Sequence, residues 1–316
     1  MSTVQPEVSV VVPVFNEVES IPKLAEEIVA ALESANRSFE VWMIDDGSTD
    51  GSWEQIEALN RADPRFAGIR LQTNYGKSAA ISLGFEAARG RYVVTMDADL
   101  QDDPAEVPEM LATLDGGADL VSGWKKKRMD PIAKTVPSRF FNFVTRVVSG
   151  IPLHDFNCGL KAYRVEVVKS IKVYGEMHRY IPVLAKRVGF TRIAEQEVNH
   201  RPRRFGETKF GFERFVRGFL DLISVKFLTQ FAARPMHFFG ILGTLAFAGG
   251  LAINSYLSIL WLMGQPIGRR PLLFLGMLLI ILGVQLFSTG LLGEMIIRPS
   301  MESTERYTVS DRLDPQ

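Results

Sequence analysis

Short apolar runs alternate with amphipathic runs over the first part of the chain. Three runs have the length and near-continuous apolarity of strands buried on both faces: residues 8–15, 41–44 and 92–96. Residues 69–71, Ile-Arg-Leu, predict a further short strand. Three runs between them have helical spacing: residues 21–32, 52–59 and 78–88. Buried strands that alternate with helices predict an α/β fold with a mostly parallel sheet covered on both faces. Ligands of such sheets bind beyond the carboxyl ends of the strands.

Two long apolar segments lie near the end of the chain. Residues 236–263 contain no Asp, Glu, Lys or Arg, and residues 272–297 contain only Glu294. Each segment exceeds the roughly 20 residues that span a bilayer. The short turn between them predicts a transmembrane hairpin with both chain ends on one side, and the lipid bilayer as a partner.

The segment before the hairpin, residues 211–234, has apolar residues at helical spacing interrupted by charged ones. This pattern predicts an amphipathic helix at the membrane interface, and a surface helix packed on the preceding domain is the alternative. We therefore expect four parts: a Rossmann-like domain over 1–210, the interfacial helix over 211–234, the hairpin over 235–298 and a tail over 299–316.

The orientation of the hairpin is indicated by flanking charges. Basic residues flank it on both sides: Lys226, Arg234, Arg298 and Arg306 on the domain side, and Arg269 and Arg270 in the loop between the spans. Under the positive-inside rule, the larger number on the domain side favours a cytoplasmic domain. The first residues resemble no signal peptide, and the lone Cys158 fits a reducing compartment. We expect a multi-pass inner (plasma) membrane protein with the domain and both termini in the cytoplasm.

The formal net charge is zero, with 36 Lys and Arg against 36 Asp and Glu, but the charges are unevenly placed. Residues 1–123 hold 8 basic and 22 acidic side chains, and residues 124–235 hold 23 and 9. The acidic part suits a site for a metal and a nucleotide, and the basic part suits phosphates and an anionic membrane surface. Because the basic part leads directly into the hairpin, nucleic acid is not an expected partner.

Acidic motifs follow three of the predicted strands, at residues 13–17, 45–52 and 97–104. Carboxylates gathered at one sheet edge repel each other unless a cation or hydrogen-bond donors compensate them. Such hard oxygen ligands suit Mg²⁺ or Mn²⁺, which commonly bridge to substrate phosphates. Taken singly, Asp97 and Asp99, or Asp50 and Ser52, could instead cap the helices that follow. Three acidic motifs at three strand ends favour the metal site.

Motifs typical of other nucleotide-binding proteins are absent. The sequence Gly76-Lys77-Ser78 matches only half of a P-loop, because residue 71 is Leu where that motif requires Gly. No Gly-x-Gly-x-x-Gly follows the first strand. These absences exclude kinase-like and dinucleotide-binding classes.

A known family carries the motifs that are present. They are, in order, Val-Pro-Val-Phe-Asn-Glu, Asp-Asp-Gly-Ser-Thr-Asp, Asn-Tyr-Gly-Lys-Ser, Asp-Ala-Asp-Leu-Gln-Asp-Asp-Pro, Cys-Gly-Leu-Lys-Ala-Tyr-Arg and Arg-Arg-Phe-Gly-Glu-Thr-Lys. In this order and spacing the chain resembles family 2 glycosyltransferases of GT-A fold. The resemblance is to the branch, including dolichyl-phosphate mannose synthase and undecaprenyl-phosphate glucosyltransferases, that transfers sugars to polyprenyl phosphate.

The resemblance implies roles at the donor site for matching positions. Residues at the nucleotide sugar would be Pro13, Phe15, Glu17, Asp46, Lys77, Asp97 and Asp99. Phe15 would lie beside the base and Asp46 would accept a hydrogen bond from it, with uracil and guanine equally suitable. The Mg²⁺ or Mn²⁺ ligands would come from Asp97, Asp99 and Gln101. Arg203 or Arg204, together with Lys209, matches the family segment that closes over the phosphates, with Thr208 in place of Ser.

A basic region that leads into an amphipathic helix and a membrane hairpin predicts an acceptor site for a lipid phosphate in that region. Its residues would be Lys125, Arg128, Arg139 and Lys161. Adhesion of residues 125–128 to anionic lipid in general is the alternative. Lys161 replaces the family Arg, which keeps the charge and loses bidentate geometry. Asp155 would orient an acceptor-binding cation or form a turn, and Cys158 is expected to be structural rather than a catalytic thiol.

A phosphate acceptor is already anionic near neutral pH, so the chemistry needs positioning and electrostatic stabilisation rather than a strong base. The family implies direct displacement at the anomeric carbon with inversion, and a homo-oligomer, with a tetramer suggested.

Glycines 276, 283 and 290 repeat every seven residues and predict close helix packing, within the hairpin or between subunits. The alternatives are a transferase with another lipid or polysaccharide acceptor and an inactive scaffold. A processive polysaccharide synthase is disfavoured, because that class carries a Gln-x-x-Arg-Trp motif and in this chain no Trp follows an Arg.

Overall fold

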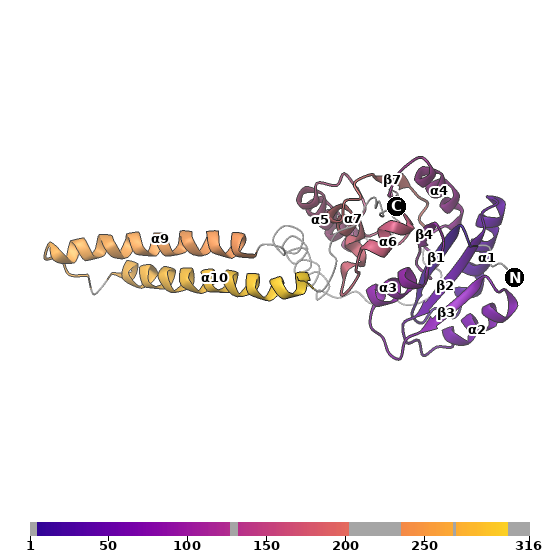
Figure 1. Cartoon of the computed structure of the whole chain (residues 1–316), viewed down its shortest axis with the longest axis horizontal. Coiled ribbons are helices and arrows are strands. Elements are labelled where there is room, and N and C mark those ends of the chain that lie inside the picture. Colours follow the sequence, from indigo (N-terminus) through magenta and orange to yellow (C-terminus); the bar gives the residue numbers. More distant parts are fainter. Residues whose placement is uncertain (1–4, 127–131, 202–234, 268–269, 303–316) are drawn as a thin grey trace, which may run out of the picture. The chain divides into compact units, whose positions relative to one another are not determined.

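The computed structural model describes residues 5–126, 132–201, 235–267 and 270–302. The chain divides into two compact units, Met1–Ile223 and Ser224–Gln316. The first contains the sheet and its helices, and the second contains the two long apolar helices (Figure 1).

The first unit is built on one seven-stranded sheet in the order β3-β2-β1-β4-β6-β5-β7. The strands are β1 Val8–Val14, β2 Phe39–Asp45, β3 Phe66–Arg70, β4 Tyr92–Thr95, β5 Leu120–Trp124, β6 Lys161–Arg164 and β7 Ile193–Glu197. Neighbouring strands are parallel except where β6 pairs with β4 and β5. The predicted mostly parallel α/β sheet is therefore confirmed, with one antiparallel strand inserted beside β4.

The third strand begins at Phe66, three residues before the predicted run. Gly68 lies inside it, and a Cβ there would come within 2.6 Å of Ile56 on the covering helix. A glycine at a close helix contact breaks the apolar pattern that otherwise reveals a strand.

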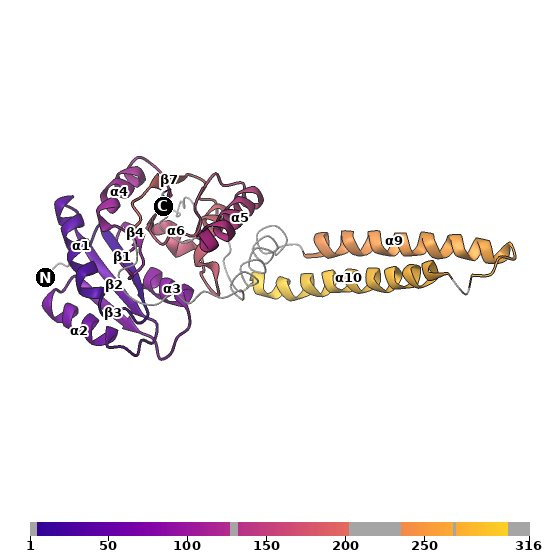
Figure 2. The same cartoon turned by 180° about the vertical axis from the view of Figure 1, so that it is seen from behind.

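Helices cover both faces of the sheet (Figures 1 and 2). One core contains residues of α1 Ile21–Ser34, α2 Ser52–Ala62 and α4 Val107–Asp115, the last preceded by the short 3₁₀ turn η1 Pro104–Glu106. The other contains residues of α3 Lys77–Ala87, α6 Val165–Ser170 and α7 Ile181–Arg187. In β1 the even-numbered valines face the first core and Val11 faces the second, as alternation along a strand requires. Helix α5 Ile132–Ser149 connects β5 to the loop before β6, and η2 Met177–Tyr180 precedes α7.

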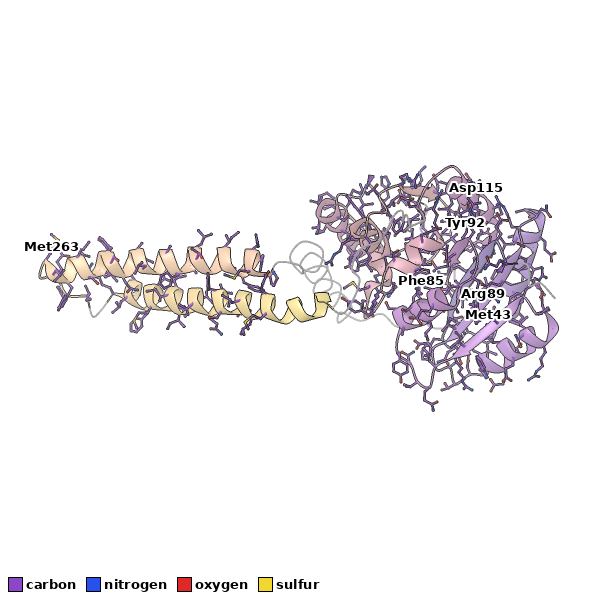
Figure 3. All side chains as sticks on the ribbon, viewed as in Figure 1. Met43, Phe85, Arg89, Tyr92, Asp115 and Met263 are labelled. Atoms are coloured by element: carbon purple, nitrogen blue, oxygen red, sulfur yellow. The ribbon has the colours of Figure 1, made fainter. Side chains whose placement is uncertain are left out.

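The amino ends of the strands are held by paired charges. Buried Glu40 of β2 accepts a hydrogen bond from Ser9 Oγ at 2.6 Å and from Arg89 Nη2 at 2.6 Å. Arg89 follows α3 and is labelled with the core residues Met43, Phe85 and Tyr92 in Figure 3. Because this carboxylate is satisfied within the protein, the amino edge is structural, and the loops available for ligands lie at the carboxyl edge.

The second unit is a pair of helices, α9 Pro235–Leu262 and α10 Pro271–Glu302. Each has a window long and apolar enough to cross a membrane, with only 17% and 11% of that window buried. Exposed apolar side chains lie along both helices, and the labelled Met263, just after α9, is also exposed (Figure 3). A helix from the core of a soluble protein would be mostly buried, so we conclude that the chain is a membrane protein with two candidate spans.

The glycine repeat of α10 packs against α9 within this pair. A Cβ on Gly283 would come within 2.7 Å of the Gly243 carbonyl oxygen, and one on Gly250 within 2.6 Å of the Gly276 carbonyl oxygen. Gly290 likewise faces Met236. The repeat therefore lets the two backbones approach within the hairpin, which was the first of its two predicted uses.

The single acid of the predicted second span also acts within the pair. The Met236 backbone N–H donates to Glu294 Oε2 at 3.4 Å. This N–H belongs to the first turn of α9, where backbone donors have no partner in their own helix and the helix dipole favours a negative charge. Glu294 thus caps the neighbouring helix.

Adjacent glycines in α9 provide a test of this packing. We expect Gly250→Ala to lower the thermal unfolding midpoint of the full chain in detergent micelles, by an amount equivalent to about 1–3 kcal/mol, because its Cβ would meet the α10 backbone. Gly249 has nothing within 4 Å of the corresponding position, so Gly249→Ala should leave the midpoint unchanged or raise it. Equal losses in the two variants would contradict the packing.

Candidate active site

The loops after β1 and β2 are joined by hydrogen bonds at the carboxyl edge. The Asn16 N–H donates to Ser48 Oγ at 3.0 Å, and the Glu17 N–H donates to Ser52 Oγ at 2.9 Å. Asp50 accepts from the Ser52 and Val18 N–H groups, so it braces these loops. The predicted donor residues Pro13, Phe15 and Glu17 are thereby fixed beside the β2 loop, with the Phe15 ring 44% exposed.

Asp46 holds a third loop to the same edge. Its two carboxylate oxygens accept the Tyr75 N–H at 2.7 Å and the Gly76 N–H at 2.9 Å. Burial raises the pKa of Asp46, and the neighbouring Asp45 adds to this shift. Gly47 has φ +76°, and a Cβ there would lie 2.7 Å from the Thr73 backbone, which explains the glycine in the Asp-Asp-Gly-Ser motif. The loop carries Tyr75, whose ring is 64% exposed.

Asp97 follows β4 and forms an ion pair with Lys77, the first residue of α3. Burial opposes ionisation of Asp97, but the positive charges of Lys77 and Lys125 outweigh it and lower the pKa to about 2. The other side of the carboxylate is covered by Gly159, where a Cβ would come within 2.6 Å of Asp97 Cγ. Asp97 is therefore a fully ionised carboxylate held between a lysine and a glycine.

Asp99 and Gln101 flank Leu100, which has φ +60° and is buried in the core. A left-handed leucine costs about 1–3 kcal/mol and persists only where its surroundings impose it. The Gln101 N–H donates to Asp99 Oδ1 at 3.2 Å. Asp103, not Asp97 or Asp99, caps η1 by accepting from the Ala105 N–H, which removes the capping alternative for the two predicted metal ligands.

The oxygen donors of this loop fit a divalent cation that binds together with substrate. In the described residues no group of three or more His, Cys, Asp or Glu side chains forms a ready metal site. Mg²⁺ commonly uses one or two carboxylates and completes its shell with water and substrate phosphates. Asp97, Asp99 and the Gln101 amide supply that type of donor on one loop.

Lys125 is buried against the loop after β4, here called the acidic loop, which carries Asp97, Asp99, Asp102 and Asp103. Its Nζ is 2.8 Å from Asp102 Oδ1, and Asp102 Oδ2 accepts the Asp97 N–H at 3.2 Å. The Lys125 side chain is 12% exposed. Burial alone would lower its pKa, but Asp102, Cys158 and Asp97 raise it. The sequence predicted a contact between Lys125 and a lipid phosphate, whereas this ammonium group is engaged in a buried ion pair that supports the loop.

Lys161 is also enclosed, at the start of β6. Its ammonium group donates to the Phe156 and Cys158 carbonyl oxygens, and burial lowers its pKa. Buried Asp155 accepts the Asn157 N–H at 3.1 Å. Both residues therefore shape the loop that carries Gly159 against Asp97, and the turn role predicted as one alternative for Asp155 describes this contact. Burial raises the pKa of Cys158 to about 12, so its thiol stays protonated, unlike a nucleophile.

Several predicted residues lie outside the described residues. They are Arg128, Arg203, Arg204, Lys209, the side chain of Arg139 and the amphipathic segment 211–234. The last described residue before that gap, Arg201, donates its N–H to the Gln101 carbonyl oxygen at 3.1 Å and pairs with Asp103 at 2.7 Å. The segment that carries Arg203, Arg204 and Lys209 thus follows directly from a residue fixed to the acidic loop.

His178 is a residue of this region that sequence reasoning missed. Its Nδ1 lies 2.9 Å from the hydroxyl of Ser78, which follows Lys77 in α3. Burial, then the charges of Lys77 and Arg179, lower the pKa of His178 to about 2. The two residues are 100 positions apart, and no local motif marks the pair.

The two adjacent lysines at the end of β5 should differ in their effect on stability. Lys125→Met leaves Asp102 buried without its partner, and we expect a loss of about 3–5 kcal/mol in the free energy of unfolding. Lys126 pairs with Glu197 at the surface, where both side chains are about half exposed, so Lys126→Met should cost about 1 kcal/mol or less. Denaturant unfolding of the full chain in micelles measures both, and similar small losses would show that Lys125 is not in a buried pair.

The neutral His178 should make stability depend on pH. Unfolded histidine has a pKa of about 6.5 and takes up a proton below it, whereas the folded ring does not. The contribution is therefore fully present above about pH 6.5 and falls by up to about 1.4 kcal/mol per pH unit as the pH drops. His178→Asn should lack this component, which unfolding midpoints between pH 6.5 and 5 measure. Parallel curves for the two proteins would contradict the buried neutral ring.

Comparison with known proteins shows the family to which this chain is similar. The model of the glycosyl transferase family 2 matches residues 9–172. Dodecaprenyl-phosphate galacturonate synthase of Rhizobium johnstonii is 39% identical over 317 residues, covering 98% of this chain and 94% of the relative. Undecaprenyl-phosphate 4-deoxy-4-formamido-L-arabinose transferase of Salmonella paratyphi A is 34% identical with the same coverage.

A solved structure shares the fold of the sheet unit. Glucosyl-3-phosphoglycerate synthase of Mycobacterium tuberculosis, crystallised with Mn²⁺, uridine diphosphate and glucosyl-3-phosphoglycerate, aligns with a TM-score of 0.54 at 20% identity. The alignment covers 71% of this chain and 80% of that one. With the family model matching more than half of the chain, and with relatives similar along its whole length, the chain belongs to glycosyl transferase family 2.

Proposed function

We propose that the protein transfers a single sugar from a UDP- or GDP-sugar to a membrane polyprenyl phosphate and releases the nucleotide diphosphate. The observation that carries this proposal is the similarity, over 98% of the chain and including both apolar helices, to relatives named for polyprenyl-phosphate acceptors. A soluble acceptor would give the exposed apolar helices no role.

The donor would bind where the loops after β1, β2 and β4 meet. Phe15 and Tyr75 offer exposed rings for the base. Pro13 lies near the end of β1, just before Phe15, and Glu17 and Asp46 lie on the loops that hold these rings. Lys77 and Asp97 would lie at the diphosphate and sugar. Asp97, Asp99 and Gln101 would hold Mg²⁺ or Mn²⁺, which neutralises charge on the leaving diphosphate when bound.

The acceptor phosphate would attack without a strong general base, because it is already anionic. A bond forms between a phosphate oxygen and the anomeric carbon, while the bond from that carbon to the diphosphate oxygen breaks, so the configuration inverts. Arg203 or Arg204, with Lys209, would close over the phosphates, and Arg128 and Arg139 would attract the acceptor. Lys125, Lys161 and Asp155 would act indirectly, by holding Asp97 and its loop in place.

The surroundings of the reaction follow from the membrane spans. We propose that the catalytic part over 1–210 and both termini face the cytoplasm at the inner membrane, with residues 211–234 at the interface. The hairpin over 235–298 would anchor the chain, the tail over 299–316 would follow it, and a homo-oligomer such as a tetramer would form through surfaces other than the glycine repeat.

The proposal is tested with the purified full chain in liposomes containing undecaprenyl phosphate and Mg²⁺ or Mn²⁺. A panel of UDP- and GDP-sugars that includes UDP-galacturonate is added, and lipid-linked sugar is detected by mass spectrometry. One donor should give a product whose mass equals the lipid phosphate plus one sugar. Transfer to a non-phosphorylated acceptor, or no product from any donor, would overturn the proposal.

Substitution of Asp99 distinguishes an active enzyme from an inactive scaffold. Asp99→Ala removes a carboxylate from the proposed cation site, so we expect the transfer rate to fall by about 100-fold or more and the response to added Mn²⁺ to weaken. Asp63→Ala, which removes a surface partner of Arg65, is the control and should keep the wild-type rate. Equal rates in the two variants would favour a chain without metal-dependent transferase activity.

A further inference from the structure

His178 has no role in the proposed function so far. It lies in η2 Met177–Tyr180, beyond residue 172 where the family model ends. Its position therefore belongs to the part of the domain that the general family pattern does not describe.

Two contacts with Ser78 define the chemistry of its ring. The His178 backbone N–H donates to Ser78 Oγ at 3.1 Å, and the same oxygen lies 2.9 Å from His178 Nδ1. The Ser78 oxygen accepts the backbone N–H and keeps its own proton, which it can donate to Nδ1. In that arrangement the neutral ring carries its proton on Nε2.

Nε2 is available for a ligand in the region of the Lys77–Asp97 pair. Within the described part of the chain Nε2 has no hydrogen-bond partner, and it is not among the enclosed polar atoms. Ser78 is the next residue after Lys77, which pairs with Asp97. The charges of Lys77, Asp97 and Lys161 all act on the ring, which places it in the same cluster.

We propose that His178 binds the sugar of the nucleotide-sugar donor, its Nε2–H donating a hydrogen bond to a sugar hydroxyl beside the Lys77–Asp97 pair. This inference rests on the proposed function. A diphosphate is best met by cations, which this cluster already supplies. A neutral N–H adds a directional hydrogen bond without adding charge, and this suits a hydroxyl group.

Three variants of the full chain separate binding from support. His178→Asn keeps a side-chain oxygen that can accept from Ser78 but does not reach the Nε2 position, whereas His178→Gln reaches that position with an N–H. His237→Asn changes a histidine of the other unit and is the matched control. Dissociation constants for UDP and for UDP-galacturonate are measured calorimetrically in micelles with Mn²⁺.

We expect His178→Asn to raise the dissociation constant of UDP-galacturonate about tenfold and that of UDP less than about twofold. His178→Gln should recover part of the loss, and His237→Asn should match the wild type. Equal weakening of both ligands would show that His178 only positions Lys77 and would overturn the inference, as would unchanged binding. If the wild-type chain binds neither UDP nor UDP-galacturonate, the proposed function fails for these donors and the inference fails with it.

Discussion

Charge compensation beneath the acidic loop is the constraint on which the site depends. Asp97 and Asp102 lie in the same loop after β4, where the Asp97 N–H donates to Asp102. Carboxylates so close together would repel each other if left unpaired. Lys77 pairs with the first and Lys125 with the second, each reaching the loop from a different element. This pairing lets ionised Asp97 persist at the sheet edge, while Asp99 and Gln101 remain on the same loop as oxygen donors for a cation that arrives with a substrate.

The side chains at the two edges of the sheet make different kinds of contact. At the amino edge Glu40 is fully engaged by Ser9 and Arg89, and its contacts stabilise the fold. At the carboxyl edge the loops are fixed to one another through backbone groups, as when Asp46 accepts the Tyr75 and Gly76 N–H groups. Side chains such as Phe15 and Tyr75 are left exposed there. A rigid frame with exposed rings and compensated charges can bind two anionic substrates without large rearrangement of the frame itself.

The fold was largely predictable from the sequence because burial on both faces leaves uninterrupted apolar strands, and the hairpin because no charged residue interrupts its first span. The candidate site was predictable as a set of loops, since acidic motifs follow β1, β2 and β4, which are neighbours in the sheet. The partners of individual side chains were not. Lys125 and Lys126 look alike in a basic run, yet one lies in a buried pair and the other at the surface. Ser78 and His178 meet across 100 residues, and such contacts depend on tertiary packing that local patterns do not encode.

The central claim is that a set of compensated charges performs one direct displacement, with no covalent intermediate on the protein. In the described residues the one thiol is buried and protonated, and the ionised carboxylate Asp97 is held by Lys77. The most direct test is the anomeric configuration of the lipid product, measured by nuclear magnetic resonance from the proton coupling at the sugar's first carbon. The account predicts the configuration opposite to that of the donor. Retention of the donor configuration would contradict it.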